Sequence, residues 1–227
     1  MFDPKILGIV FLSLKVAALA MLVVVPLAIV VGRLLARPGL RGKALLSALV
    51  HLPLVLPPVV TGYTLLLVFG RRGWIGSILD QWGIGLVFSW TGAALAAGLM
   101  AFPLVVRPIR LAFETQDARL EDIAATLGAG RWKRFSTIAL PLAWPGVLAG
   151  LVLGFAKALG EFGATITFVS NIPEETQTLS LAIYTLLQSP SGDRAAIILI
   201  GISIALSFIA IIASEWTMAI MERKRER

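Results

Sequence analysis

Five segments of this chain are long and apolar enough to cross a membrane as helices. Four of them contain no Asp, Glu, Lys or Arg (residues 44–70, 86–106, 138–156 and 195–214), and in the fifth (residues 6–32) the first charged residue is Lys15. A bilayer's hydrocarbon core needs about 20 mostly apolar helical residues to cross it. The mean hydropathy of +0.89 and the hydrophobic share of 58% exceed those of ordinary soluble domains. The sequence therefore predicts an integral membrane protein.

The spans are predicted to be helices rather than the strands of a barrel. A barrel requires repeated strand-length alternation of apolar and polar residues, which does not recur here. We expect a five-span, all-α fold in one domain, residues 1–227, with spans at about 6–35, 43–70, 86–113, 138–165 and 195–221 and a loop at about 114–137. The first segment is too long for a secretory signal and lacks a basic start and a cleavage site, so it is expected to stay in the membrane. Residues 179–187 are apolar but too short to cross, and are expected to lie in the outer leaflet.

Lysine and arginine predict the orientation, because short loops rich in them stay in the cytoplasm. One side of the predicted topology collects fourteen basic residues: Arg33, Arg37, Arg41, Lys43, Arg107, Arg110, Arg119, Arg131, Lys133, Arg134, Arg223, Lys224, Arg225 and Arg227. The other side holds Lys5, Arg71, Arg72 and Arg194 together with the acids Asp3, Asp80, Glu174, Glu175 and Asp193. The N-terminus is therefore expected outside, and the C-terminus and the loop at 114–137 in the cytoplasm.

The second span contains three prolines and the only histidine of the chain. Pro53, Pro57 and Pro58 remove backbone donors and are expected to break and bend this span. Bent helices suit a pathway but also occur in plain bundles. His51 is polar within a span, which favours a functional role by default; the simpler interpretation is that its ring hydrogen-bonds a carbonyl freed by a proline.

A charged cluster follows the fourth apolar run. Lys157 and Glu161 are one helical turn apart, so they are expected to pair and reduce the cost of burial. One interpretation is a snorkelling pair at the outer end of the helix. The other is a gate or pathway lining, in which glycines let backbones approach closely. The candidate gate residues are Lys157, Gly160, Glu161, Phe162, Gly163 and Thr165.

The loop at 114–137 contains a short amphipathic helix. Leu120, Ile123, Ala124 and Leu127 recur at helical spacing and form one narrow apolar stripe among charged residues. Asp117 is the expected N-cap, and Gly128 and Gly130 are the expected stops. Such a stripe must pack against something. A soluble partner subunit and the bilayer surface are the two candidates.

Several kinds of chemistry have no support in this sequence. The chain has no cysteine, which excludes disulfides and thiol catalysis. A lone histidine makes neither a metal site nor a catalytic triad. No glycine-rich Walker loop occurs, so any nucleotide that drives this protein is bound by another chain. The net charge of +7 follows from the loop charges and is not interpreted as nucleic-acid binding.

With these residues in view, the chain resembles the permease subunits of bacterial type I ABC importers over nearly its whole length. Their cytoplasmic coupling motif reads Glu-Ala-Ala, three residues, Gly, nine residues, Ile, one residue, Leu-Pro. Here Asp122 and Ile123 replace the first two residues, and Glu121 stands one place earlier. The coupling residues that the resemblance implies are Glu121, Asp122, Ala124, Ala125, Gly128, Ile138, Leu140 and Pro141.

Within that family, residues 51–60, 127–132 and 160–173 are similar to the molybdate permeases, with sulfate permeases as near relatives. The resemblance implies a multi-pass protein of the bacterial inner membrane that imports molybdate or tungstate. It also implies a homodimer bound to two ATPase subunits, which hold ATP and Mg, and an extracytoplasmic molybdate-binding protein. No cofactor and no catalytic residue are expected in this chain.

Three alternatives remain open from the residues. A sulfate or thiosulfate permease has the same architecture. A passive channel, or a scaffold whose cytoplasmic helix lies on lipid headgroups, has the same composition. A membrane enzyme is the weakest of the three, because no constellation of catalytic side chains is present.

Overall fold

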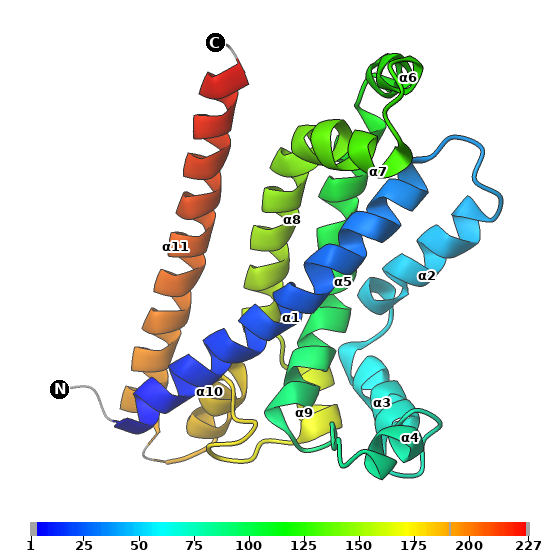
Figure 1. Cartoon of the computed structure of the whole chain (residues 1–227). Coiled ribbons are helices and arrows are strands. Elements are labelled where there is room, and N and C mark those ends of the chain that lie inside the picture. The colour runs from blue at the N-terminus through cyan, green and yellow to red at the C-terminus, as the bar shows by residue number, and fades with distance from the viewer. Residues whose placement is uncertain (1–3, 191, 226–227) are drawn as a thin grey trace.

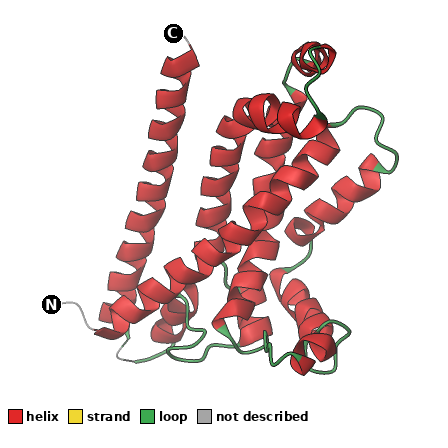
Figure 2. Ribbon diagram, in the orientation of Figure 1, coloured by secondary structure: helices red, strands yellow, loops and turns green. Residues whose placement is uncertain are grey.

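The computed structural model describes residues 4–190 and 192–225, and this part of the chain is helical without strands (Figure 2). The predicted all-α class is therefore confirmed. Asp3 and Arg227, which entered the orientation argument, lie outside the described residues. The helices, in chain order, are α1 Pro4–Ala36, α2 Lys43–Val55, α3 Pro58–Phe69, α4 Gly76–Gln81, α5 Trp90–Glu114, α6 Ala118–Thr126, α7 Arg131–Arg134, the π-helix η1 Phe135–Ala139, α8 Leu140–Leu159, α9 Gly163–Val169, α10 Leu179–Leu187 and α11 Asp193–Arg225.

Helix α5 is the centre of the bundle, with α1 and α8 packed against it (Figure 1). Small residues permit this packing, as is usual between membrane helices. A Cβ added to Gly98 of α5 would lie 3.1 Å from Val24 of α1, and one added to Gly150 of α8 would lie 2.8 Å from the carbonyl oxygen of Val105. Glycine at these positions lets three spans meet at close distance.

The second predicted span, residues 43–70, is two helices instead of one. The chain bends by 112° between α2 and α3, across a break of two residues. Pro57 caps α3 and Pro58 is its first residue, whereas Pro53 lies inside α2. Among the described residues, four helices are long and apolar enough to span, or five if this bent pair counts as one span. The break predicted from the prolines is present, and Pro57 and Pro58 account for it.

The fourth predicted span, residues 138–165, also differs from one continuous helix. Its helical rod begins at Arg131 and runs through α7 and η1 into α8. The wider turn of η1 comes just before Pro141, which has no N–H to donate to a regular helix. The rod ends at Leu159, and after Gly160–Phe162 the chain resumes as the short helix α9. This second break was not predicted from the sequence.

The remaining elements define two ends of the bundle. Figure 1 shows α6, α7 and the ends of α1 and α11 at the top, and α4, α9, α10 and the start of α1 at the bottom. The predicted short apolar segment, residues 179–187, coincides with α10. Helix α11 stands at the side of the bundle with its apolar surface largely exposed. The helix ends that carry most of the basic residues thus lie together, at the same end as α6.

Candidate functional site

Helix α6 is a short amphipathic helix at one end of the bundle, as predicted. The Asp117 carboxylate accepts a hydrogen bond from the backbone N–H of Arg119 at 3.0 Å, which confirms the N-cap. At the other end Gly128 has φ of +82°, a left-handed conformation that favours glycine. The apolar stripe is open: Ile123 is 58% and Leu127 82% exposed, and no residue of α6 is buried. This helix therefore presents its stripe to the surroundings of the chain.

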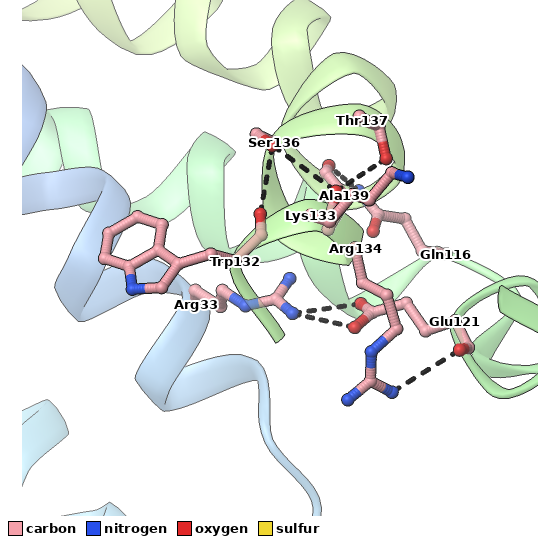
Figure 3. Close-up of polar contacts among 9 residues, drawn as sticks. All are labelled: Arg33, Gln116, Glu121, Trp132, Lys133, Arg134, Ser136, Thr137 and Ala139. Atoms are coloured by element: carbon pink, nitrogen blue, oxygen red, sulfur yellow. Dashed lines mark hydrogen bonds and ion pairs between the residues drawn. The ribbon is translucent and has the colours of Figure 1, made fainter. Parts of the chain in front are cut away.

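The two adjacent acids of α6, Glu121 and Asp122, differ in their surroundings, and Figure 3 shows those of Glu121. Both carboxylate oxygens of Glu121 accept hydrogen bonds from Nη2 of Arg33 on α1, at 3.1 and 2.9 Å. Arg134 of α7 donates to the backbone carbonyl of Glu121 at 3.4 Å. Asp122 is exposed and has no side-chain hydrogen bond among the described contacts. The acid one place before the motif is therefore turned inward, and the acid within the motif faces outward.

Two aromatic rings hold the guanidinium that binds Glu121. The Cζ atom of Arg33 lies 5.5 Å from the ring centroid of Phe113 on α5 and 5.1 Å from that of Phe135 in η1. Both distances are within the range of cation–π attraction. Arg33 thus connects α1, α5, the start of the fourth rod and α6. From the sequence, Arg33 was predicted only as a cytoplasmic charge, because no local pattern links it to Glu121, 88 positions away.

The second half of the motif lies in the bundle and not beside the exposed stripe. Ile138 belongs to η1, and Leu140 and Pro141 begin α8. The side chain of Gln116, just before α6, donates a hydrogen bond from Nε2 to the carbonyl of Ala139 at 2.9 Å. Ala124 is half-buried and Ala125 exposed. The motif therefore includes residues of the exposed helix α6 and residues of η1 and the start of α8.

An open cleft of about 830 Å³ separates α6 from the ends of α1 and α5. Its lining carries both signs of charge: the basic residues are Arg33, Arg37, Arg131 and Arg134, and the acids are Glu114, Asp117, Glu121 and Asp122. Because both signs line the cleft, it has no strong preference for a free anion or a free cation.

The candidate gate cluster lies at the break between α8 and α9. The Lys157 ammonium donates to the Glu161 carboxylate, as predicted, and the other Glu161 oxygen accepts the N–H of Ala164 at 3.1 Å. Glu161 is 2% exposed. Phe162 lies against Tyr184 of α10, with ring centroids 4.9 Å apart. Within this chain Thr165 is also buried, whereas Gly160 is exposed.

The two helix breaks contact each other. A Cβ on Gly163, the first residue of α9, would lie 2.7 Å from Cβ of Pro58, the first residue of α3. A Cβ on Gly62 would lie 2.5 Å from the carbonyl oxygen of Ala164. Glycines at these positions are required for the close approach of α3 and α9. The candidate gate segment is thus packed on the helix that follows the proline break.

His51 and Lys15 have simple partners. Nδ1 of His51 lies 2.7 Å from the carbonyl oxygen of Ser47. The partner is a backbone carbonyl, as expected, but Pro53 frees the carbonyl of Leu49 rather than that of Ser47. The ammonium of Lys15 lies 3.6 Å from the ring centroid of Trp90 on α5. Within residues 4–190 and 192–225, no three or more His, Asp or Glu side chains are grouped so that they could hold a metal ion.

Comparison with known proteins matches nearly the whole chain to one family of transport proteins. Residues 9–225 match the family described as the binding-protein-dependent transport system inner membrane component. The molybdenum transport system permease protein ModB of Escherichia coli K12 is 57% identical over 219 residues, which cover 96% of each chain. A probable sulfate transport system permease protein of Chlorella vulgaris is more distant, 35% identical over 196 residues that cover 86% of this chain and 74% of that one.

A solved structure has the same fold. It is a bacterial alginate ABC transporter in complex with an alginate pentasaccharide-bound periplasmic protein, and the match has a TM-score of 0.72 at 17% identity, covering 93% of this chain and 77% of that one. This likeness concerns the fold alone. The chain belongs to the binding-protein-dependent transport system inner membrane components, the permease family of ABC importers that the coupling motif predicted.

Proposed function

We propose that this chain is the membrane subunit of an ATP-driven importer of molybdate, with tungstate as a second substrate. The observation that carries the proposal is the 57% identity to a molybdenum permease over 96% of both chains. The sulfate alternative rests on a relative with 35% identity. Identity at this level over nearly the whole length of both chains favours a shared substrate over a shared fold only.

The proposed assembly is a homodimer with two ATPase subunits and an extracytoplasmic binding protein for the oxyanion. A single bundle of this size encloses little, so two copies would form the pathway between them. The N-terminus would be outside, and α6, with the basic helix ends, in the cytoplasm. ATP and Mg would be bound by the ATPase, because the chain has no Walker loop.

Helix α6 is the proposed docking element for the ATPase. Its apolar stripe is exposed and its neighbours form a cleft with both signs of charge. When ATP draws the ATPase subunits together, a docked α6 would move its permease half between inward-open and outward-open packings. The chain would perform mechanical work and make no covalent change.

The proposed gate is the segment from Gly160 to Thr165 with the Lys157–Glu161 pair. Support comes from its position at a helix break that packs against a second break at Pro58. The substrate is a tetrahedral dianion, and an uncompensated charge in a low-dielectric region costs several kcal/mol. The ammonium of Lys15 lies over the ring of Trp90, and that of Lys157 is paired with Glu161. Because both cations have partners within the chain, we expect them to bind the anion weakly and to release it quickly.

Co-purification tests the docking proposal against a passive channel or a scaffold on lipid. The chain would be expressed with its partner ATPase and isolated in detergent. Leu127→Glu places a charge on the stripe, at a residue 82% exposed, and we expect it to release the ATPase while the permease stays folded. Ile78→Glu makes the same change on α4 at the other end and should retain the ATPase. Equal retention by both variants, or no ATPase with the unmodified chain, would contradict docking at α6.

A further inference from the structure

We propose that Arg33 is a positioning residue that transmits the movement of α6 to α1. This inference rests on the proposed function, because it concerns how docking at α6 becomes movement of the bundle. Arg33 would touch neither ATPase nor substrate. It would act through Glu121, and its loss would uncouple ATP hydrolysis from transport.

Helix α6 has few other means of holding its position. It buries no residue in the bundle, so apolar packing does not fix it. Apart from the N-cap bond to the adjacent Asp117, the side-chain hydrogen bonds between α6 and the rest of the described chain all involve Glu121: two from Arg33 to its carboxylate and one from Arg134 to its carbonyl. The peptide before α6 is anchored by Gln116, whose side chain donates to the carbonyl of Ala139, and the peptide after α6 turns at the exposed, left-handed Gly128. Apart from the peptide at its two ends, a force applied to α6 would therefore pass to the bundle through Glu121.

Arg33 itself is held on a tightly packed part of α1. The preceding residue, Gly32, is buried so closely that an added Cβ would lie 3.0 Å from Ile109 and 3.2 Å from the backbone nitrogen of Arg110 on α5. Leu35 is fully buried. The guanidinium is further fixed by the rings of Phe113 and Phe135. Movement of Glu121 is thus passed to α1, α5 and the foot of the fourth rod together.

The residue type fits this role. A guanidinium is planar, so it can lie against aromatic rings while its N–H groups point at a carboxylate. A lysine ammonium would keep the charge but lose that geometry. The pair is partly exposed, and such pairs contribute little to folding. Variants are therefore expected to fold, which makes coupling measurable.

The test is a double-mutant cycle on the complete complex in proteoliposomes, with permease, ATPase and molybdate-loaded binding protein. Two quantities are measured: the ATPase retained on purification, and the molybdate transported per ATP hydrolysed. Arg33→Met and Glu121→Gln should each retain the ATPase and lower the transport ratio about five-fold, and the double variant should be no worse than either. Arg41→Met, a charge loss at an exposed residue between α1 and α2 that does not line the cleft, should keep the ratio within about two-fold of the unmodified complex.

Three results would overturn the inference: unchanged ratios in both single variants, losses that multiply in the double variant, or loss of the ATPase from the complex. The last would make Glu121 a docking residue. Failure of the proposed function would be seen separately, because the unmodified complex would then show no ATP-dependent uptake. Arg33→Lys adds a further check and should recover less than half of the lost ratio.

Discussion

The Lys157 ammonium is paired with the Glu161 carboxylate, which is almost fully buried at the break between α8 and α9. The same carboxylate accepts the N–H of Ala164 in the first turn of α9. Glu161 therefore binds a side chain in the last turn of α8 and a backbone N–H in the first turn of α9. A residue with two such partners fixes the angle at which the candidate gate segment leaves the fourth span.

Removing the cation should destabilise this break. Lys157→Met leaves a buried carboxylate without its partner and is expected to cost about 1–3 kcal/mol. Glu161→Gln keeps an oxygen for Ala164 and should restore part of that loss when combined with Lys157→Met. The measurement is thermal unfolding of the purified permease in detergent. If Lys157→Met unfolds at the same temperature as the unmodified protein, the pair does not stabilise the break.

Two glycines near α6 form a matched pair for testing the turn. Gly128 has φ of +82° and Gly130 has φ of −65°, and an added Cβ at either would meet no atom within 4 Å. Gly128→Ala should cost about 1–2 kcal/mol through backbone strain alone. Gly130→Ala should be nearly neutral. Equal transport and equal ATPase retention in the two variants would mean that the left-handed turn is not needed to present α6.

Close packing of the two broken helices gives another prediction. Gly62→Ala places a methyl group 2.5 Å from the carbonyl oxygen of Ala164, so α3 and α9 must separate. We expect this to cost about 1–3 kcal/mol, the usual effect of overpacking. Gly8→Ala, at a position of α1 with no neighbouring atom within 4 Å, should be neutral or slightly stabilising. Both are measured as unfolding temperatures, and similar values would show that the approach of α3 to α9 is not tight.

Local signals in the sequence predicted local structure well. The apolar run of residues 179–187 became α10, Asp117 caps α6, and Gly128 turns the chain. Proline chemistry predicted a break in the second span but not its angle of 112°, because a missing N–H permits a bend without setting its size.

The contacts and the helix break that were missed depend on which side chains are buried together, and two of the contacts join residues far apart in the chain. Arg33 donates hydrogen bonds to Glu121, 88 positions away, and the ammonium of Lys15 lies over the ring of Trp90. At the break at Gly160–Phe162, the buried Glu161 carboxylate accepts the N–H of Ala164, which a continuing helix would pair with a backbone carbonyl. The periodic spacing of apolar residues carries no information on such contacts. Spacing alone therefore predicts one continuous fourth span, residues 138–165.

Accessibility of the gate segment can be measured directly because the chain has no cysteine. Gly160 is exposed, and an added Cβ has room, with its nearest atom at 3.7 Å. Thr165 is 2% exposed. A water-soluble maleimide should therefore label Gly160→Cys at least about ten-fold faster than Thr165→Cys if the break borders a hydrated pathway. The reverse order, or labelling of Gly160→Cys by lipid-soluble reagents only, would contradict a hydrated path at this position.

The most direct test of the proposed function is uptake of radiolabelled molybdate by proteoliposomes containing this chain, its ATPase and the binding protein. Uptake should require both ATP and the binding protein. Tungstate at equal concentration should compete, since it has the same charge and nearly the same size, whereas sulfate should compete poorly. Uptake without ATP, or inhibition by sulfate as strong as that by tungstate, would contradict the assignment.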